Sequence, residues 1–275
     1  MKNFKIFNTL NKMDVEDVSL WIAEAEFGLT HVKSQISILD EESNILEVGC
    51  GSGILLAMLS EEFPKLKFNG IEPYGKGFSK LKSLNEAVQK EGVNIKIESY
   101  DQHLPNIKYD FIYCINVFEH VDDWKEFLLW ASKNLKKNGK FFVLCPNYGF
   151  PYESHFKIPI ILNKKVTYNL FKNYINKYEL SNNCLGLWGS LNFVKKSQLK
   201  KYCCINFSMI GFNIIDDKSI MDEMVARISY DSEFKKRQSF VGKIAVILKR
   251  VGLFNFVKFF PNFLPYMKLV FVKDV

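Results

Sequence analysis

The sequence predicts an α/β fold with a seven-stranded, mostly parallel sheet, helices on both faces and helical insertions. From residue 44 onward, short apolar runs alternate with segments of helical periodicity. Gly, Pro, Asn or Asp bounds most of the apolar runs, as expected where strands end. Strands that alternate with helices form a parallel sheet whose crossover helices cover its two faces. A content of 48% hydrophobic residues in 275 suffices for a full core.

The elements are expected in the following order. Strands are predicted at Asn44–Val48, Lys67–Ile71, Ile95–Ser99, Asp110–Asn116, Lys140–Cys145, Gly211–Asp216 and Met267–Val272. Helical patterns cover Asp14–Leu39, Ser52–Phe63, Gly77–Glu91, Asp123–Lys136 and Ser197–Cys204, and Asn138–Gly139 is expected to end the fourth of these helices. We expect one domain over residues 1–275, with a helical cap at 1–43, a core at 44–146, an insertion at 147–190 and a C-terminal part at 191–275.

The composition indicates the redox setting of the protein and the partners that it does not favour. The six cysteines form no CxxC pair and the histidines show no zinc-binding spacing, so we expect a reducing, cytoplasmic setting without disulfides. A formal charge of +7 is modest for this length and does not by itself indicate nucleic acid. No run of about 20 apolar residues predicts a membrane-spanning helix.

A glycine-rich turn between the first strand and its helix predicts a ligand site. Glu47 is followed by Gly49, Gly51 and Gly53. Glycines at such a turn permit positive φ and let the backbone approach a ligand closely. The spacing differs from the GxGxxG pattern of dinucleotide-binding folds. Glu47 is expected to face the same cleft and to receive a positively charged group.

The second strand ends at Glu72, about 20 residues beyond this turn. A carboxylate at that strand end accepts hydrogen bonds from the two hydroxyls of a ribose and repels a 2′-phosphate. An unphosphorylated nucleoside with a cationic, amino-acid-like group fits both acidic residues. S-adenosylmethionine has this chemistry.

The motifs resemble those of the class I S-adenosylmethionine-dependent methyltransferases. The resemblance rests on ILEVGCGSG at 45–53, IEP at 71–73, the acidic step at Asp101, YDFIYCINVFEHVDDW at 109–124 and LKKNGKFFVLCPN at 135–147, which occur in the family's order. It implies a Rossmann-like sheet whose seventh strand is antiparallel. It also implies that 44–146 binds the cofactor and that the acceptor lies near 147–190.

The resemblance also assigns cofactor contacts. Glu47 and the loop Gly49, Cys50, Gly51, Ser52 and Gly53 would hold the methionine and adenosine portions; Glu72 would bind the ribose beside Pro73; Asp101 and Gln102 would approach the adenine; and Asn116, Val117 and Phe118 would line the sulfonium side.

Three polar residues are candidates for the catalytic group. His120 follows the fourth strand in a step that resembles quinone-biosynthesis O-methyltransferases. Glu153 and His155 follow the fifth strand in a string that resembles methyltransferases of bacterial surface-polysaccharide biosynthesis. A hydroxyl acceptor needs a base within hydrogen-bond reach, which these side chains could supply. The alternative is that they hold their loops in place.

We therefore expect methyl transfer to an oxygen of a small-molecule, glycan or nucleotide-sugar acceptor. A non-catalytic cofactor-binding subunit, and a methyltransferase acting on RNA or on a lipid-linked acceptor, are the alternatives. A nucleic-acid acceptor is not favoured, because Asn116-Val117-Phe118 stands where amine methyltransferases of nucleic acids carry an Asn/Asp-Pro-Pro-aromatic step.

No metal is expected, since Asp122 and Asp123 suit a helix start better than a Mg²⁺ site. The apolar, basic segment 243–260 favours a buried or homodimer-facing helix over a membrane-surface contact.

Overall fold

Seven strands form one sheet in the order β3-β2-β1-β4-β5-β9-β8. The computed structural model describes residues 4–13, 18–75, 78, 81–231, 234, 242, 246–247, 249–250, 252 and 260–274. The strands are β1 (Asn44–Val48), β2 (Lys67–Ile71), β3 (Ile95–Lys96), β4 (Tyr109–Ile115), β5 (Leu135–Pro146), β8 (Phe212–Asp216) and β9 (Tyr266–Lys273). Strand β9 alone runs against its neighbours β5 and β8, which confirms the predicted antiparallel last strand.

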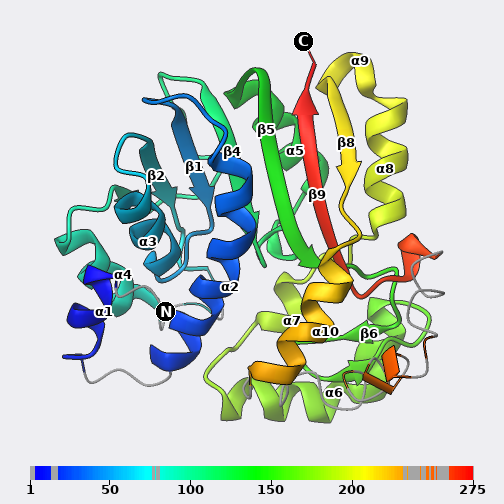
Figure 1. Ribbon diagram of the computed structural model, residues 1–275. Coiled ribbons are helices and arrows are strands. Elements are labelled where there is room, and N and C mark those ends of the chain that lie inside the picture. The colour runs from blue at the N-terminus through cyan, green and yellow to red at the C-terminus, as the bar shows by residue number, and fades with distance from the viewer. Residues whose placement is uncertain are drawn as a thin grey trace.

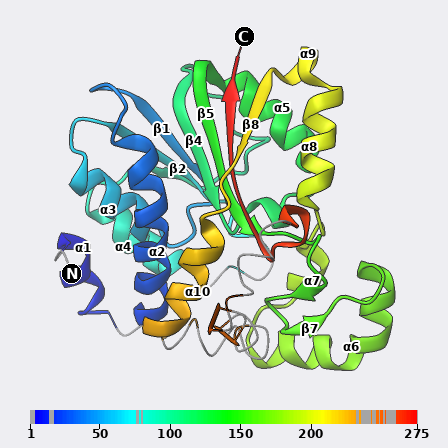
Figure 2. The ribbon, with the colours of Figure 1, turned by 45° about the vertical axis from the view of Figure 1, so that its right-hand side comes forward.

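Alternating side chains of the strands enter two separate cores. In β5, Phe142 and Leu144 join the core beneath one set of helices, whereas Phe141 and Val143 join the core on the opposite face. The first set is α1 (Lys5–Leu10), α2 (Val18–Ile36), α3 (Ile54–Glu62), α4 (Lys82–Lys90) and α10 (Ile220–Tyr230). The second is α5 (Trp124–Asn134), α8 (Lys196–Ile205) and α9 (Phe207–Ile210) (Figures 1 and 2). Helices on both faces were predicted and are confirmed.

Two expected boundaries are wrong. The helix predicted to continue to Asn138–Gly139 ends at Asn134, because Leu135 already pairs with Tyr109 of β4. The extra residues before Lys140 form an irregularity in β5, where Asn138 has a φ of 62°. Strand β3 is also shorter than expected, and Ile97 beyond it is 59% exposed. The start of α5 agrees with the sequence, since the Asp123 carboxylate accepts from the N–H groups of Lys125 and Glu126.

The 147–190 insertion has an apolar core of its own. It consists of a short hairpin of β6 (Tyr152–Glu153) and β7 (Ile158–Pro159), the helix α6 (Lys164–Ser181) and the turn α7 (Leu187–Ser190). Phe156, Ile175 and Trp188 pack together at its centre. Figures 1 and 2 show these elements below the carboxyl edge of the sheet, the edge where β1 and β4 end. The insertion therefore lies on the side of the sheet to which the glycine-rich turn leads.

Two further single-turn helices complete the described chain, η2 (Phe118–His120) and η3 (Pro261–Phe263). The segment 243–260, for which a buried or homodimer-facing helix was predicted, lies mostly outside the described residues. Within the part of the chain that the structure describes, no helix is both long enough and apolar enough to cross a membrane.

Candidate functional site

The turn between β1 and α3 is held by backbone hydrogen bonds to the neighbouring strand. The N–H groups of Gly49 and Cys50 donate to the carbonyl oxygen of Ile71 at the end of β2, at 2.8 and 3.1 Å. Gly49, Gly51 and Gly53 have φ values of 70°, 52° and 75°. All three are in the left-handed region, where a side chain would be strained.

Close packing gives two of these glycines a second reason to lack a side chain. A Cβ on Gly49 would lie 2.5 Å from a methyl group of Val117, and one on Gly53 would lie 2.6 Å from Ile95 Cδ1. From the sequence, these glycines were expected to let a ligand approach the backbone. In the structure, Val117, which follows β4, and Ile95 of β3 also occupy the space that a side chain at Gly49 or Gly53 would need.

Glu47 is a buried carboxylate at the end of β1. Its side chain is 4% exposed and accepts a 3.0 Å hydrogen bond from the Tyr113 hydroxyl. The pKa of Glu47 is raised to about 8. Burial is the main cause and the charge of nearby Glu72 adds to it, whereas the hydrogen bond from Tyr113 lowers the pKa. A cation placed here would stabilise the ionised carboxylate, as the sequence argument expected of this residue.

Glu72 connects the glycine-rich turn to the next strand. Its two oxygens accept from the N–H groups of Gly51 and Tyr74, at 2.9 and 2.8 Å. Burial raises the pKa of Glu72, although these two bonds oppose the shift. Each oxygen keeps further acceptor capacity, so the side chain can still bind a diol.

Several expected cofactor residues are held by local contacts. The Cys50 side chain is buried in the core, Ser52 Oγ accepts a long 3.4 Å bond from the N–H of Ile54, and Pro73 is exposed. Asp101 and Gln102 are exposed and both bond to Ser99 within their own turn. No contact here places these two side chains at the glycine-rich turn.

The end of β4 presents two of its three expected residues to the site. Asn116 has a φ of 54° and its side-chain oxygen accepts a 2.9 Å bond from the Tyr266 hydroxyl. Val117 packs on the glycine-rich turn at Gly49. Phe118 is fully buried, with its ring against Phe127, so its side chain does not line the site as expected.

The three candidate catalytic residues come together although they are distant in sequence. The rings of His120 and His155 are 5.3 Å apart between centroids. Glu153 is fully buried, and one of its oxygens lies 2.6 Å from His155 Nδ1. Burial opposes the ionisation of Glu153, but His155 and the N–H groups of His155 and Phe156 outweigh it and lower the pKa.

Glu119 and Ser190 complete this cluster, and neither was predicted as a functional residue. Glu119 is fully buried, and neither of its carboxylate oxygens receives a hydrogen bond from any described residue. Ser190 Oγ lies 2.9 Å from His120 Nδ1. Glu119, His120 and His155 each offer one ligand atom within 4.8 Å of the others, so they could hold a metal ion. The Glu-His pair in sequence was a signal for Glu119, whereas nothing local pointed to Ser190.

A family model described as a methyltransferase domain matches residues 26–199, more than half of the chain. The matched span contains the glycine-rich turn, Glu72 and the histidine cluster. The chain belongs to the class I S-adenosylmethionine-dependent methyltransferases.

Named relatives agree with this placement. This methyltransferase is 28% identical over 221 residues to an uncharacterized protein of Mycobacterium tuberculosis, covering 79% of the chain and 73% of that protein. It is 27% identical over 152 residues to the ubiquinone biosynthesis O-methyltransferase of Rickettsia prowazekii, a match to 48% of the chain and 58% of the relative. The second match thus spans little more than half of the named enzyme.

Solved structures share the fold of this methyltransferase. The phosphoethanolamine N-methyltransferase 2 of Haemonchus contortus, in complex with S-adenosyl-L-methionine, has a TM-score of 0.52 at 16% identity, over 90% of this chain and 52% of that one. The plantazolicin methyltransferase BpumL, in complex with S-adenosylhomocysteine, has a TM-score of 0.51 at 14% identity, over 98% and 90%.

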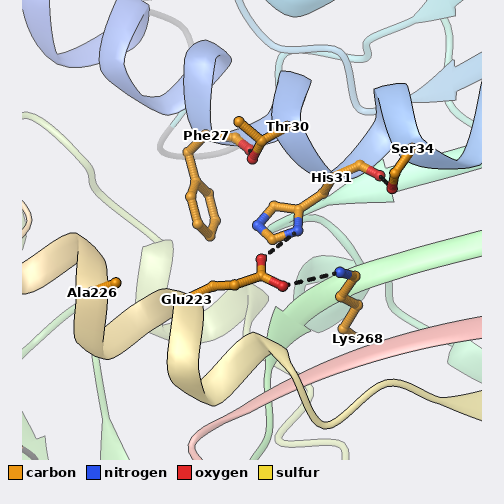
Figure 3. Close-up of a pocket in the computed structure, with 7 residues that line it drawn as sticks. All are labelled: Phe27, Thr30, His31, Ser34, Glu223, Ala226 and Lys268. Carbon is orange, nitrogen blue, oxygen red and sulfur yellow. Dashed lines mark hydrogen bonds and ion pairs between the residues drawn. The ribbon is translucent and has the colours of Figure 1, made fainter.

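A cavity of about 430 Å³ lies elsewhere in the methyltransferase, between α2, α10 and β9 (Figure 3). It is lined by Phe27, Thr30, His31, Ser34, Glu223, Ala226 and Lys268. Glu223 lies 3.1 Å from His31 Nδ1 and 3.5 Å from Lys268 Nζ. Since the cavity shares no residue with the glycine-rich turn or the histidine cluster, we do not assign the methyl-transfer chemistry to it.

Proposed function

We propose that this methyltransferase methylates a hydroxyl oxygen of a small-molecule or glycan acceptor held between the carboxyl edge of the sheet and the insertion. The observation that carries the proposal is the meeting of His120, at the end of β4, with Glu153 and His155 of the insertion. Polar, partly buried side chains from two segments meet there on the edge that carries the glycine-rich turn.

His155 is the better candidate for the base. Its side chain is 25% exposed, compared with 11% for His120, so an acceptor can reach it more readily. The ionised Glu153 accepts at 2.6 Å from Nδ1, which orients the ring and strengthens Nε2 as a proton acceptor. Burial is the main cause of the lowered pKa of His120, with His155 and Lys164 adding to it, so His120 is neutral at pH 7. Its role is therefore to orient the acceptor.

The cofactor site fits S-adenosylmethionine. Glu47 is buried with a raised pKa and would be stabilised by the cationic amino-acid portion, while Glu72 would accept from the ribose hydroxyls. When bound, S-adenosylmethionine supplies the methyl group: the C–S bond breaks, its electron pair stays on sulfur, and S-adenosylhomocysteine leaves. The acceptor oxygen forms the new C–O bond, and its proton passes to His155.

A small apolar cavity lies beside the segment that carries Glu153. It is lined by Pro146, Tyr152, Ser154, Tyr266 and side chains of α10, among others. Tyr152 and Ser154 flank Glu153 in sequence, and the Tyr266 hydroxyl bonds to Asn116 at the end of β4. The ubiquinone relative acts on oxygen, which favours the same acceptor atom here.

Cofactor binding is tested first, by calorimetry with S-adenosylmethionine. The parent should bind, and Glu72→Ala should weaken binding by about 10²–10⁴-fold, because two hydrogen bonds to a charged group are lost at about 1.5–3 kcal/mol each. Glu41→Ala removes a carboxylate that is 69% exposed and is the matched control with unchanged affinity. Absence of binding by the parent would overturn the proposal in favour of a non-catalytic role.

Acceptor chemistry is tested by release of S-adenosylhomocysteine with panels of glycans, nucleotide sugars, quinols, RNA and lipid-linked sugars. A hydroxyl acceptor should be turned over, with His155→Ala lowering kcat by about 10²–10⁴ while cofactor affinity is retained. Its pH–rate profile should lose the acidic limb, in which the rate of the parent rises with pH as the base loses its proton. Turnover of RNA alone, or methylation at nitrogen, would contradict the proposed acceptor.

A further inference from the structure

We propose that Glu119, His120 and His155 form a binding site for one divalent first-row transition-metal ion, of the Fe²⁺ to Zn²⁺ range. The ion's binding follows from the geometry of this cluster, and its use in catalysis rests on the function proposed above. Two imidazoles and one carboxylate are a ligand set that such ions favour and that Mg²⁺ and Ca²⁺ do not.

The hydrogen bonds around His120 fix which of its ring nitrogens carries the lone pair. Ser190 Oγ donates its single proton to the carbonyl oxygen of Leu187 at 2.8 Å. It must therefore accept from His120 Nδ1–H, 2.9 Å away. Nε2 of the neutral ring then carries the lone pair, and this atom lies 4.0 Å from Oε1 of Glu119.

His155 is oriented in the same way by a stronger partner. Oε1 of Glu153 accepts from the backbone N–H of His155 and lies 2.6 Å from Nδ1, so Nδ1 donates to it and a ligand bond would form through Nε2. A carboxylate or hydroxyl on the outer nitrogen is the usual support of a metal-binding histidine, because it fixes the tautomer and increases the basicity of the ligating nitrogen. Both histidines of the cluster have such a partner.

Glu119 indicates a bound cation independently of the two histidines, because it is a buried carboxylate. It is 0% exposed, and both of its oxygens lack a hydrogen bond from the described residues. Leaving a buried carboxylate without a partner is costly, and buried charges are normally paired or bound to metal. Since this carboxylate lies close to both histidines, a cation bound between the three side chains would stabilise its ionised form. The nearby Lys164 ammonium does not supply it, because it donates to the carbonyl oxygens of Gly189 and Leu191.

The distances allow an ion with modest side-chain rotation. The three ligand atoms lie within 4.8 Å of one another. Ligands about 2.1 Å from one ion at roughly tetrahedral angles are about 3.4 Å apart. The atoms His120 Nε2 and Glu119 Oε1, which lie 4.0 Å apart, would therefore approach by about 0.6 Å, and no pair by more than about 1.4 Å. Three protein ligands leave coordination positions open for an acceptor hydroxyl. The ion would lower the pKa of that hydroxyl, the proton would pass to water, and the histidines would then act as ligands instead of as a base.

The test is Co²⁺ binding to chelator-treated full-length protein, followed by calorimetry and visible absorption. We expect one Co²⁺ per chain, displaced by Zn²⁺, with at least about 100-fold weaker binding in Glu119→Gln and His155→Ala. Glu153→Gln should weaken binding by about 10–100-fold through its effect on His155. His31→Gln is the matched control, because His31 is also buried beside a glutamate, at 3.1 Å from Glu223. Its Co²⁺ affinity should be unchanged.

His155 is partly exposed, so His155→Ala should remain folded even if Glu119→Gln does not. Equal Co²⁺ affinity in the parent and His155→Ala, or no Co²⁺ binding by the parent, would overturn the metal proposal. Methyl transfer that survives chelation but is lost in His155→Ala would also overturn it, while leaving the proposed function in place with His155 as the base. Absence of methyl transfer with bound Co²⁺ would instead count against the proposed function alone.

Discussion

Gly49→Ala tests whether the glycine-rich turn is set by packing as well as by backbone conformation. Its φ of 70° costs alanine about 1–2 kcal/mol. The new Cβ would lie 2.5 Å from a Val117 methyl group, and such overpacking costs about 1–3 kcal/mol more. The expected loss in free energy of unfolding is therefore about 2–5 kcal/mol.

Gly92→Ala is the matched control for the conformational part. Gly92 has a φ of 88°, and an added Cβ would meet nothing within 4 Å, so only about 1–2 kcal/mol should be lost. Chemical denaturation of both variants gives the difference directly. Adding Val117→Ala to Gly49→Ala should restore about 1–3 kcal/mol, as measured by a double-mutant cycle. Equal losses in the two glycine variants, with no coupling to Val117, would refute the packing argument.

Three further predictions concern buried charges. The pKa of Glu47 rises from 4.5 to about 8, so the folded state binds the extra proton between these values; the contribution of Glu47 to cofactor-free stability should fall by roughly 1.4 kcal/mol per unit as pH rises from about 5 to 8, and Glu47→Gln should remove this contribution from the denaturation series. Burial lowers the pKa of His31 from 6.5 to about 4, so the contribution of His31 has the opposite sign and should fall by up to about 3 kcal/mol as pH falls through that window, offsetting that of Glu47 where the two ranges overlap; an unchanged acid slope in His31→Gln would contradict this. Arg227 is 2% exposed and bonds to Glu24 and Asp231 at 2.8 Å each. Arg227→Lys should therefore lower the free energy of unfolding by about 2–4 kcal/mol, as measured by thermal or chemical denaturation. A loss under about 1 kcal/mol would show that lysine reaches both partners.

The strands at the centre of the sheet could be predicted closely. Asn44–Val48 and Lys67–Ile71 have the predicted bounds, because buried parallel strands are short apolar runs that turn residues delimit. Helical insertions were predicted, but the bounds of helix α6 within residues 147–190 were not. Only three of its residues, Thr167, Ile175 and Glu179, are buried, so its sequence has little of the apolar periodicity that identifies a helix.

The candidate site was predictable where it depends on one strand and its turn. Glu47, Glu72 and the glycines lie together as expected, since parallel strands end on one edge. The Tyr113 partner of Glu47 was not predicted, although the two residues are opposite each other in the β1–β4 register. That pairing follows only once the strand order is known. The meeting of His120 with His155 depends on how the insertion folds back, which no local pattern specifies.

Buried charges in this methyltransferase divide into two kinds, and the division separates structure from function. Lys196 is 1% exposed and pairs with Asp216 at 3.1 Å, and Arg227 is paired as described above. These charges are compensated within the chain and contribute to its packing. Glu47 and Glu119 are also buried, but among the described residues the first accepts a hydrogen bond from a neutral hydroxyl and the second accepts none.

Burial raises the pKa of both carboxylates, Glu47 to about 8 and Glu119 to about 7, despite the lowering effects of the Tyr113 hydroxyl and of His155. In the folded protein, ionisation of these two carboxylates, which lie on the same edge of the sheet, is therefore unfavourable in free energy. A ligand recovers that free energy on binding if it carries positive charge to these carboxylates. The sulfonium and ammonium groups of S-adenosylmethionine would meet this requirement at Glu47, as proposed above, and a divalent ion would meet it at Glu119. The same electrostatic reasoning thus links the assigned cofactor to the proposed metal ion.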